Sequence, residues 1–118
     1  MSTFHGGIAD GKSVALRRAP ILLRVVVDPD GRVDALYDPD DLARPHERIS
    51  LYILTKHPVH MHIRMANRKQ SGFYSDGDYQ LCPLQPDDAT LRDNAKYFTW
   101  CDERKDLLMP KWAKEKTQ

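Results

Sequence analysis

The stretch His57-Pro58-Val59-His60-Met61-His62 comes closest, in residue type and spacing, to a chemical site. His60 and His62 stand two residues apart, so on a β-strand they share one face, where one Zn²⁺ ion could bridge them. His57 falls in the preceding turn and has the wrong parity for that face. A third ligand would have to come from Asp76, Asp78 or His5, and the sequence does not show that any of them lies near. We therefore expect surface histidines, with no metal and no other cofactor.

These two histidines belong to a seven-residue alternation of apolar and polar side chains from Val59 to Met65. Such alternation predicts a half-buried β-strand. Its apolar face carries Val59, Met61, Ile63 and Met65, and its other face carries His60, His62 and Arg64. The polar face is a candidate surface for a metal, an anion or a protein partner.

Two glycine-containing motifs resemble ligand loops but indicate turns. Asp28-Pro29-Asp30-Gly31 begins like a calcium loop, yet no glutamate stands at its twelfth position, and the proline and glycine suit a hairpin turn. Gly6-Gly7-x-x-Asp10-Gly11 lacks the lysine and serine of a phosphate-binding loop. Neither cysteine sits in a glycine-rich elbow, and Gly-x-Ser-x-Gly is absent, so we expect no catalytic residues.

Length and composition indicate one globular domain. The chain has 118 residues, 30% of them charged, and a net charge of +1, so any basic patch has to be local and the charge argues against a nucleic-acid partner. The first residues lack the pattern of a signal peptide, and no apolar run is long enough to cross a bilayer. We therefore expect no membrane association and no secretion by a cleaved signal. Cys82 and Cys101 are expected to be reduced and to pack as small apolar residues.

The rest of the chain predicts a strand-rich fold. Ile21 to Val27 and Arg32 to Tyr37 flank the Asp28 to Gly31 turn and should form a hairpin. Ile49 to Thr55 alternates again and is expected to pair with the strand that follows it. That pairing would put Tyr52 on the outward face with His60 and His62. Gly72 to Tyr74 and Asp78 to Cys82 are predicted to form one strand with a bulge near Gly77.

After Pro83 and Pro86 the pattern changes to that of a helix. Asp87 or Asp88 suits its N-cap, and Leu91, Ala95, Phe98 and Cys101 fall at helical spacing on one face. We expect an α+β domain: a small antiparallel β-sheet or partly open β-barrel of five to seven strands, with one C-terminal helix. Its parts would be a β-rich core over residues 3–82, a helix over 87–108 and a basic tail over 109–118.

Basic and aromatic residues interleave at Arg64 to Tyr74 and again at Lys111 to Lys116, where either stretch could contact a phosphate backbone. A solvated loop and a solvated tail are the simpler interpretations, and the near-neutral net charge favours them. Trp112 is the exception, because a large aromatic side chain on a polar tail is a typical interface anchor. We expect a protein partner rather than a nucleic acid.

The opening Phe4-His5-Gly6-Gly7-x-x-Asp10-Gly11, the segments Val33 to Tyr37 and Ile49 to Leu54, and Gly72-Phe73-Tyr74 before Tyr79 resemble small β-rich proteins of bacteriophages, especially phages of actinobacteria. The resemblance spans residues 4–81 and rests on short motifs. It implies a capsid or tail accessory role, located in the virion or the host cytoplasm. The segment from Lys56 to His62 and the charged C-terminus depart from the pattern, so no functional residue is carried over.

Three functional hypotheses follow. The first is a non-enzymatic phage virion accessory protein that binds other virion proteins, or copies of itself, through its termini and one face of the sheet. The residues expected to bind are Tyr52, His60, His62, Arg64 and Trp112. The second is an intracellular inhibitor of a host defence protein. The third is a metal-dependent hydrolase that uses His60 and His62.

Overall fold

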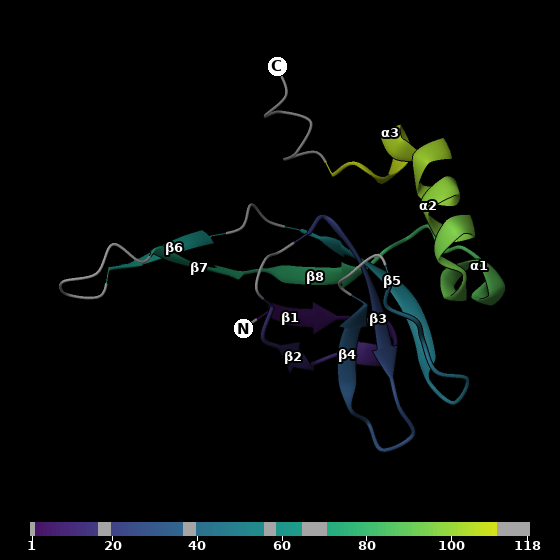
Figure 1. The fold of residues 1–118 in the computed structure, drawn as a ribbon, viewed down its shortest axis with the longest axis horizontal. Helices are drawn as coiled ribbons and strands as arrows, with labels where there is room; N and C mark the ends of the chain where they lie inside the picture. Colours follow the sequence, from purple (N-terminus) through teal and green to yellow (C-terminus); the bar gives the residue numbers. More distant parts are fainter. Residues whose placement is uncertain (1, 17–19, 37–39, 56–58, 65–70, 111–118) are drawn as a thin grey trace.

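The structure, a computed structural model, describes residues 2–16, 20–36, 40–55, 59–64 and 71–110; for residues 59–64 and 71–76 it describes the backbone alone. These residues form an α+β fold built on a six-stranded mixed sheet with short helices after it (Figure 1). The elements are β1 (Ser2–His5), a 3₁₀ turn (Gly7–Ala9), β2 (Ser13–Val14), β3 (Leu22–Val27), β4 (Val33–Leu36), β5 (Arg48–Leu54), β6 (Val59–Arg64), β7 (Ser71–Asp76), β8 (Asp78–Leu81), α1 (Asp88–Arg92), α2 (Asn94–Glu103) and α3 (Lys105–Leu108).

The large sheet has the order β2-β1-β8-β5-β3-β4 and curls until its outer strands meet. β2 lies against β4, which makes the sheet a nearly closed barrel. The pairing is antiparallel throughout except between β1 and β8, which run parallel with Phe4 opposite Tyr79. The prediction of a partly open barrel is confirmed, and the parallel pair makes its sheet mixed rather than antiparallel.

The barrel interior is filled by side chains from every second position of its strands. Phe4, Tyr52 and Tyr79 are fully buried there, with the Phe4 ring 5.2 Å from that of Tyr52 and 5.5 Å from that of Tyr79. Ring pairs at these separations add about 0.5–1.5 kcal/mol to the effect of area burial. The aliphatic residues around them include Leu23, Val25, Val27 and Leu54.

A second core lies on the outer face of β3 and β5, under the helices. It contains Val26, Ile49, Leu51, Cys82, Leu91, Tyr97 and Leu108. Both faces of β3 and β5 are therefore buried, which explains why β3 is a continuous apolar run broken only by Arg24.

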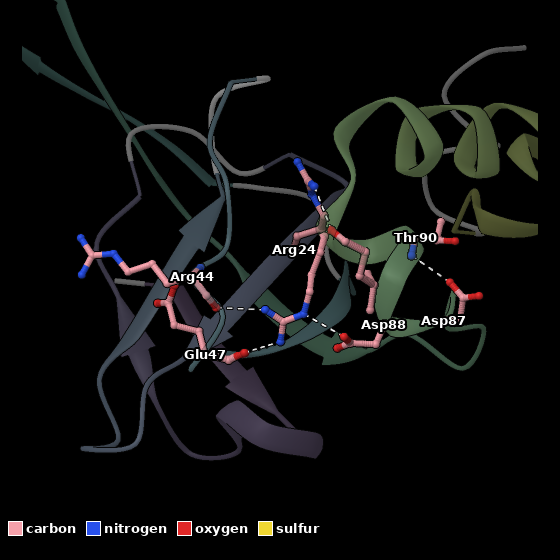
Figure 2. A network of polar contacts seen from close by, with 8 residues as sticks. Arg24, Arg44, Glu47, Asp87, Asp88 and Thr90 are labelled. Atoms are coloured by element: carbon pink, nitrogen blue, oxygen red, sulfur yellow. Dashed lines mark hydrogen bonds and ion pairs between the residues drawn. The ribbon is translucent and has the colours of Figure 1, made fainter.

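The predicted single helix over 87–108 is wrong, because three short helices occupy that region. Asp93 causes the first break: it adopts an extended conformation at the end of α1, and its carboxylate accepts the Lys96 N–H as the N-cap of α2. The prediction of Asp87 as an N-cap is confirmed, since its Oδ1 accepts the Thr90 N–H at 2.8 Å (Figure 2).

The predicted hairpin is confirmed, with β3 and β4 pairing from Val27 opposite Val33 to Arg24 opposite Leu36. In its turn the Asp28 carboxylate accepts the Arg32 N–H, and Gly31 has a φ of +86°. Asp28 therefore serves the geometry of the turn.

Two pairing predictions are wrong. β5 pairs with β3 and β8 instead of with β6, and β7 and β8 belong to different sheets instead of forming one bulged strand. Gly77 is the switch point: its C=O accepts the Thr3 N–H at 3.0 Å, and its N–H donates to the Ser2 hydroxyl at 3.2 Å. These bonds hold β8 in the barrel, while β7 leaves it.

Among the helices that the structure describes, none has the length and apolar character needed to cross a membrane.

Candidate functional site

The most distinctive surface is a two-stranded ribbon, β6 with β7, which we call the arm. Its strands pair antiparallel from Val59 opposite Asp76 to Arg64 opposite Ser71. Within the described part of the chain, neither strand pairs with any other. Figure 1 shows the arm extending from the start of β8 away from the barrel and from the helices.

The register of the arm assigns its residues to two faces, because directly opposed residues in an antiparallel pair share a face. One face carries Val59, Met61 and Ile63 on β6, with Tyr74 opposite Met61. The other carries His60, His62 and Arg64, with Ser75, Phe73 and Ser71 opposite them. The predicted strand with one apolar and one basic face is thus confirmed at the level of the backbone.

Tyr52 does not belong to this surface, so the prediction that it faces outward with His60 and His62 is wrong. Its side chain is fully buried inside the barrel. The hydroxyl donates to the Gly6 C=O at 2.6 Å and accepts the Ala9 N–H at 2.9 Å. The error arose because alternation in β5 was taken to mean that one face of the strand is exposed to solvent. In fact the face with Tyr52 lines the barrel, and the helices cover the other face.

The other candidate binding residues divide between the arm and the C-terminus. His60, His62 and Arg64 lie together on β6, and their side chains are outside what the structure describes. Trp112 and His57 also lie outside the described residues. The N-terminal strand β1 is built into the barrel, where Ser2 and Phe4 are buried.

The Gly6-Gly7-x-x-Asp10-Gly11 motif is a turn, as predicted. The Asp10 carboxylate accepts the Gly6 N–H at 2.7 Å, and the Gly11 N–H returns to the Phe4 C=O at 2.9 Å. Gly7 has a φ of +65°, and a Cβ there would stand 2.8 Å from Leu81 Cδ1. The turn places the Gly6 C=O and the Ala9 N–H where both bond to the Tyr52 hydroxyl.

A second surface feature, which the sequence patterns did not predict, is an apolar groove of about 290 Å³ between the start of β3 and the helices α2 and α3. Phe98 lines it with 47% of its surface exposed, beside Ile21, Leu108 and Met109. The prediction that Ala95 and Phe98 share one helix face with Leu91 is wrong, because Leu91 is buried whereas Ala95 and Phe98 are exposed. Because the chain breaks at Asp93, the helical phase set by Leu91 does not continue, and α2 buries Tyr97 instead.

The side chain of Arg24, in β3, contacts α2 and fixes the orientation in which that helix buries Tyr97. Arg24 is 2% exposed, and its guanidinium donates to the Leu91 C=O at 3.0 Å and to Asn94 Oδ1 at 2.8 Å and lies 4.3 Å from the centre of the Tyr97 ring. Burial lowers the pKa of Arg24, while burial and the Cys101 thiol raise the pKa of Tyr97. A lone polar residue within the β-branched run at 21–27 was the sequence signal for this contact.

Loop 41–47 is clamped to α1 by Arg92. Its guanidinium donates to Asp88 Oδ2 at 2.8 Å, to the Arg44 C=O at 2.9 Å and to the Glu47 C=O (Figure 2). Beside this loop a hollow of about 950 Å³ runs along β4 and the seam with β2. Three of its carboxylates accept backbone amides: Asp28 that of Arg32, Asp34 that of Ala35 and Glu47 that of Arg44. These carboxylates therefore hold the backbone around the hollow.

The cysteines behave as predicted in being free thiols. Cys82 is buried in the outer core and Cys101 is half-buried beside it. Burial raises the pKa of both thiols. Within the described residues, no group of three histidine, cysteine or acidic side chains is placed to hold a metal ion.

Comparisons with protein-family models, with curated proteins and with solved structures find no match for this chain.

Proposed function

We propose that this chain is a non-enzymatic protein-binding component whose arm docks on another protein, and that this protein belongs to a bacteriophage particle. The first part is carried by the arm, an amphipathic ribbon that pairs with no other described strand. The second part rests on the sequence resemblance to small phage proteins.

The physical argument starts from the stability of the arm. A two-stranded hairpin is at best marginally stable in water, and it needs a third strand or a covered apolar face. The apolar face of the arm carries residues of types that proteins usually bury, namely Val59, Met61, Ile63 and Tyr74. A partner that covers this face would gain a free energy of about 0.8 kcal/mol for each CH₂ group that it buries. The arm is therefore suited to become ordered against another protein.

The barrel supplies the anchorage. β8 continues from β7 through Gly77 and is paired on both sides, with β1 and with β5. Force or torque on a docked arm is thus passed to the centre of the sheet rather than to an edge strand. This arrangement suits an accessory protein that holds onto an assembly.

The test is mass spectrometry of purified particles from the phage that encodes the chain, with copy number measured against the major capsid protein. We expect a fixed ratio for the wild-type chain and a large loss of incorporation for Ile63→Asp, which charges the apolar face.

The matched control is Ser71→Asp, which adds the same charge on the other face of the arm next to Gly72, the residue opposite Ile63. A second control, Phe98→Ser, alters the groove and should leave incorporation unchanged. Absence of the wild-type chain from particles would refute the virion role, and equal incorporation of Ile63→Asp and Ser71→Asp would refute the arm as the docking surface.

A further inference from the structure

We propose that the polar face of β6 is half of a site for a divalent cation that prefers imidazole ligands, such as Zn²⁺, and that two copies of the chain complete it by pairing their β6 strands. This inference is separate from the docking proposed above, because it uses the opposite face and the free edge of the arm. The juxtaposition that carries it is His60 and His62 at positions i and i+2 of a strand whose second edge has no described partner.

Among the residues that the structure describes, one copy alone does not place enough ligands on this face. The positions opposite His60 and His62 on the same face are Ser75 and Phe73, and the position opposite Arg64 is Ser71. None of these is a usual zinc ligand, whereas a structural zinc site takes four nitrogen, sulfur or carboxylate ligands. A second copy supplies the same pair of imidazoles and so brings the number of histidines to four.

An antiparallel pair of β6 strands brings the histidines together in register. If Met61 of one copy stands opposite Met61 of the other, His60 of each copy stands opposite His62 of the other, on one face. Directly opposed Cα atoms in such a pair are about 4.5–5.5 Å apart, and residues two apart on a strand are separated by about 6.6 Å. Four histidines with these spacings between their Cα atoms supply the four ligands that tetrahedral zinc takes.

The same register keeps like charges apart and leaves the docking face free. The two Arg64 residues fall at opposite ends of the new sheet, about 20 Å apart along the strand direction. The pairing turns a marginally stable two-stranded ribbon into a four-stranded sheet, and a sheet of three or more strands can be stable by itself. Val59, Met61 and Ile63 of both copies then form one continuous apolar face.

The experiment measures molar mass by light scattering on the full chain after treatment with EDTA, with and without added ZnCl₂. We expect a monomer without metal and a dimer with one Zn²⁺ per two chains. Since zinc binds neutral imidazole, the dimer should dissociate as the pH falls below about 6. His60→Ala and His62→Ala should each remain monomeric in ZnCl₂, while His46→Ala, an exposed histidine in loop 41–47, should dimerise like the wild type.

Circular dichroism of each variant checks that the barrel is folded. A wild-type chain that stays monomeric in ZnCl₂, or a dimer that persists in His60→Ala, would overturn the proposal. Ile63→Asp separates it from the proposed function: that variant should lose incorporation into particles and keep zinc-dependent dimerisation. Loss of the zinc dimer with normal incorporation would remove this inference alone.

Discussion

The hydroxyl of Tyr52 in β5 and the carbonyl of Gly6 are joined by a 2.6 Å hydrogen bond between residues that are 46 positions apart in the sequence. The same hydroxyl accepts the Ala9 N–H, so one buried side chain holds both ends of the turn that follows β1. After this turn the chain runs back as β2, which pairs with β1 and lies against β4 where the barrel closes. Tyr52 is therefore a structural residue of the barrel.

Replacing Tyr52 by phenylalanine should leave a buried donor and a buried acceptor without this partner. We expect the free energy of unfolding to fall by about 2–4 kcal/mol. In the same variant the Ala9 amide should exchange with solvent faster than core amides such as that of Val25. Unchanged unfolding and unchanged exchange at Ala9 would show that the hydroxyl does not hold the turn.

Gly7 and Gly11 provide a matched pair for the packing of this turn. Both have positive φ, +65° and +75°, so alanine is strained at either position. A Cβ at Gly7 would also meet Leu81 at 2.8 Å and the Tyr52 hydroxyl at 3.0 Å, while one at Gly11 meets nothing within 4 Å. In urea unfolding, Gly7→Ala should therefore lose about 1–3 kcal/mol more than Gly11→Ala. Equal losses would mean that strain alone matters there.

Arg24→Met tests the contact between β3 and the helices. The substitution keeps most of the side-chain volume but removes the donors to the Leu91 C=O and to Asn94. We expect a loss of about 2–3 kcal/mol in the free energy of unfolding, because a buried carbonyl loses its partner. Arg48→Met makes the same change at an exposed position of β5 and should stay within about 0.5 kcal/mol.

Stability should fall in alkaline solution. Burial raises the pKa of Tyr52, Tyr97 and Cys82, so the folded state keeps protons that the unfolded state releases. A raised pKa contributes stability that is complete below the unfolded pKa and is lost as the pH rises above it. The free energy of unfolding should be level to about pH 8 and then decline, with a slope of up to about 1.4 kcal/mol per pH unit for each such group. Tyr97→Phe should reduce the slope above pH 10, and a flat profile to pH 11 would contradict this account.

The sequence predicted local structure well where one physical signal dominated. Alternation located β5 and β6, and Pro29 with Gly31 located the hairpin turn. It did not predict which strands pair, because the parallel pairing of Phe4 with Tyr79 joins residues 75 positions apart and leaves no local signal. Nor did it place Tyr52, since both faces of β5 are buried and alternation alone does not identify a second covered face. Phe98 was misplaced because capping by Asp93 resets the helical phase.

The central claim is that the arm gains its order from a partner protein. Hydrogen exchange of the amides in residues 59–64 and 71–76 tests this directly, measured on the metal-free chain alone and on the chain bound to purified particles. We predict rapid exchange in the free chain and strong protection of both strands in the bound chain, with little change in β3 and β5. Equal exchange in the two states, or protection confined to α2 and α3, would contradict the account.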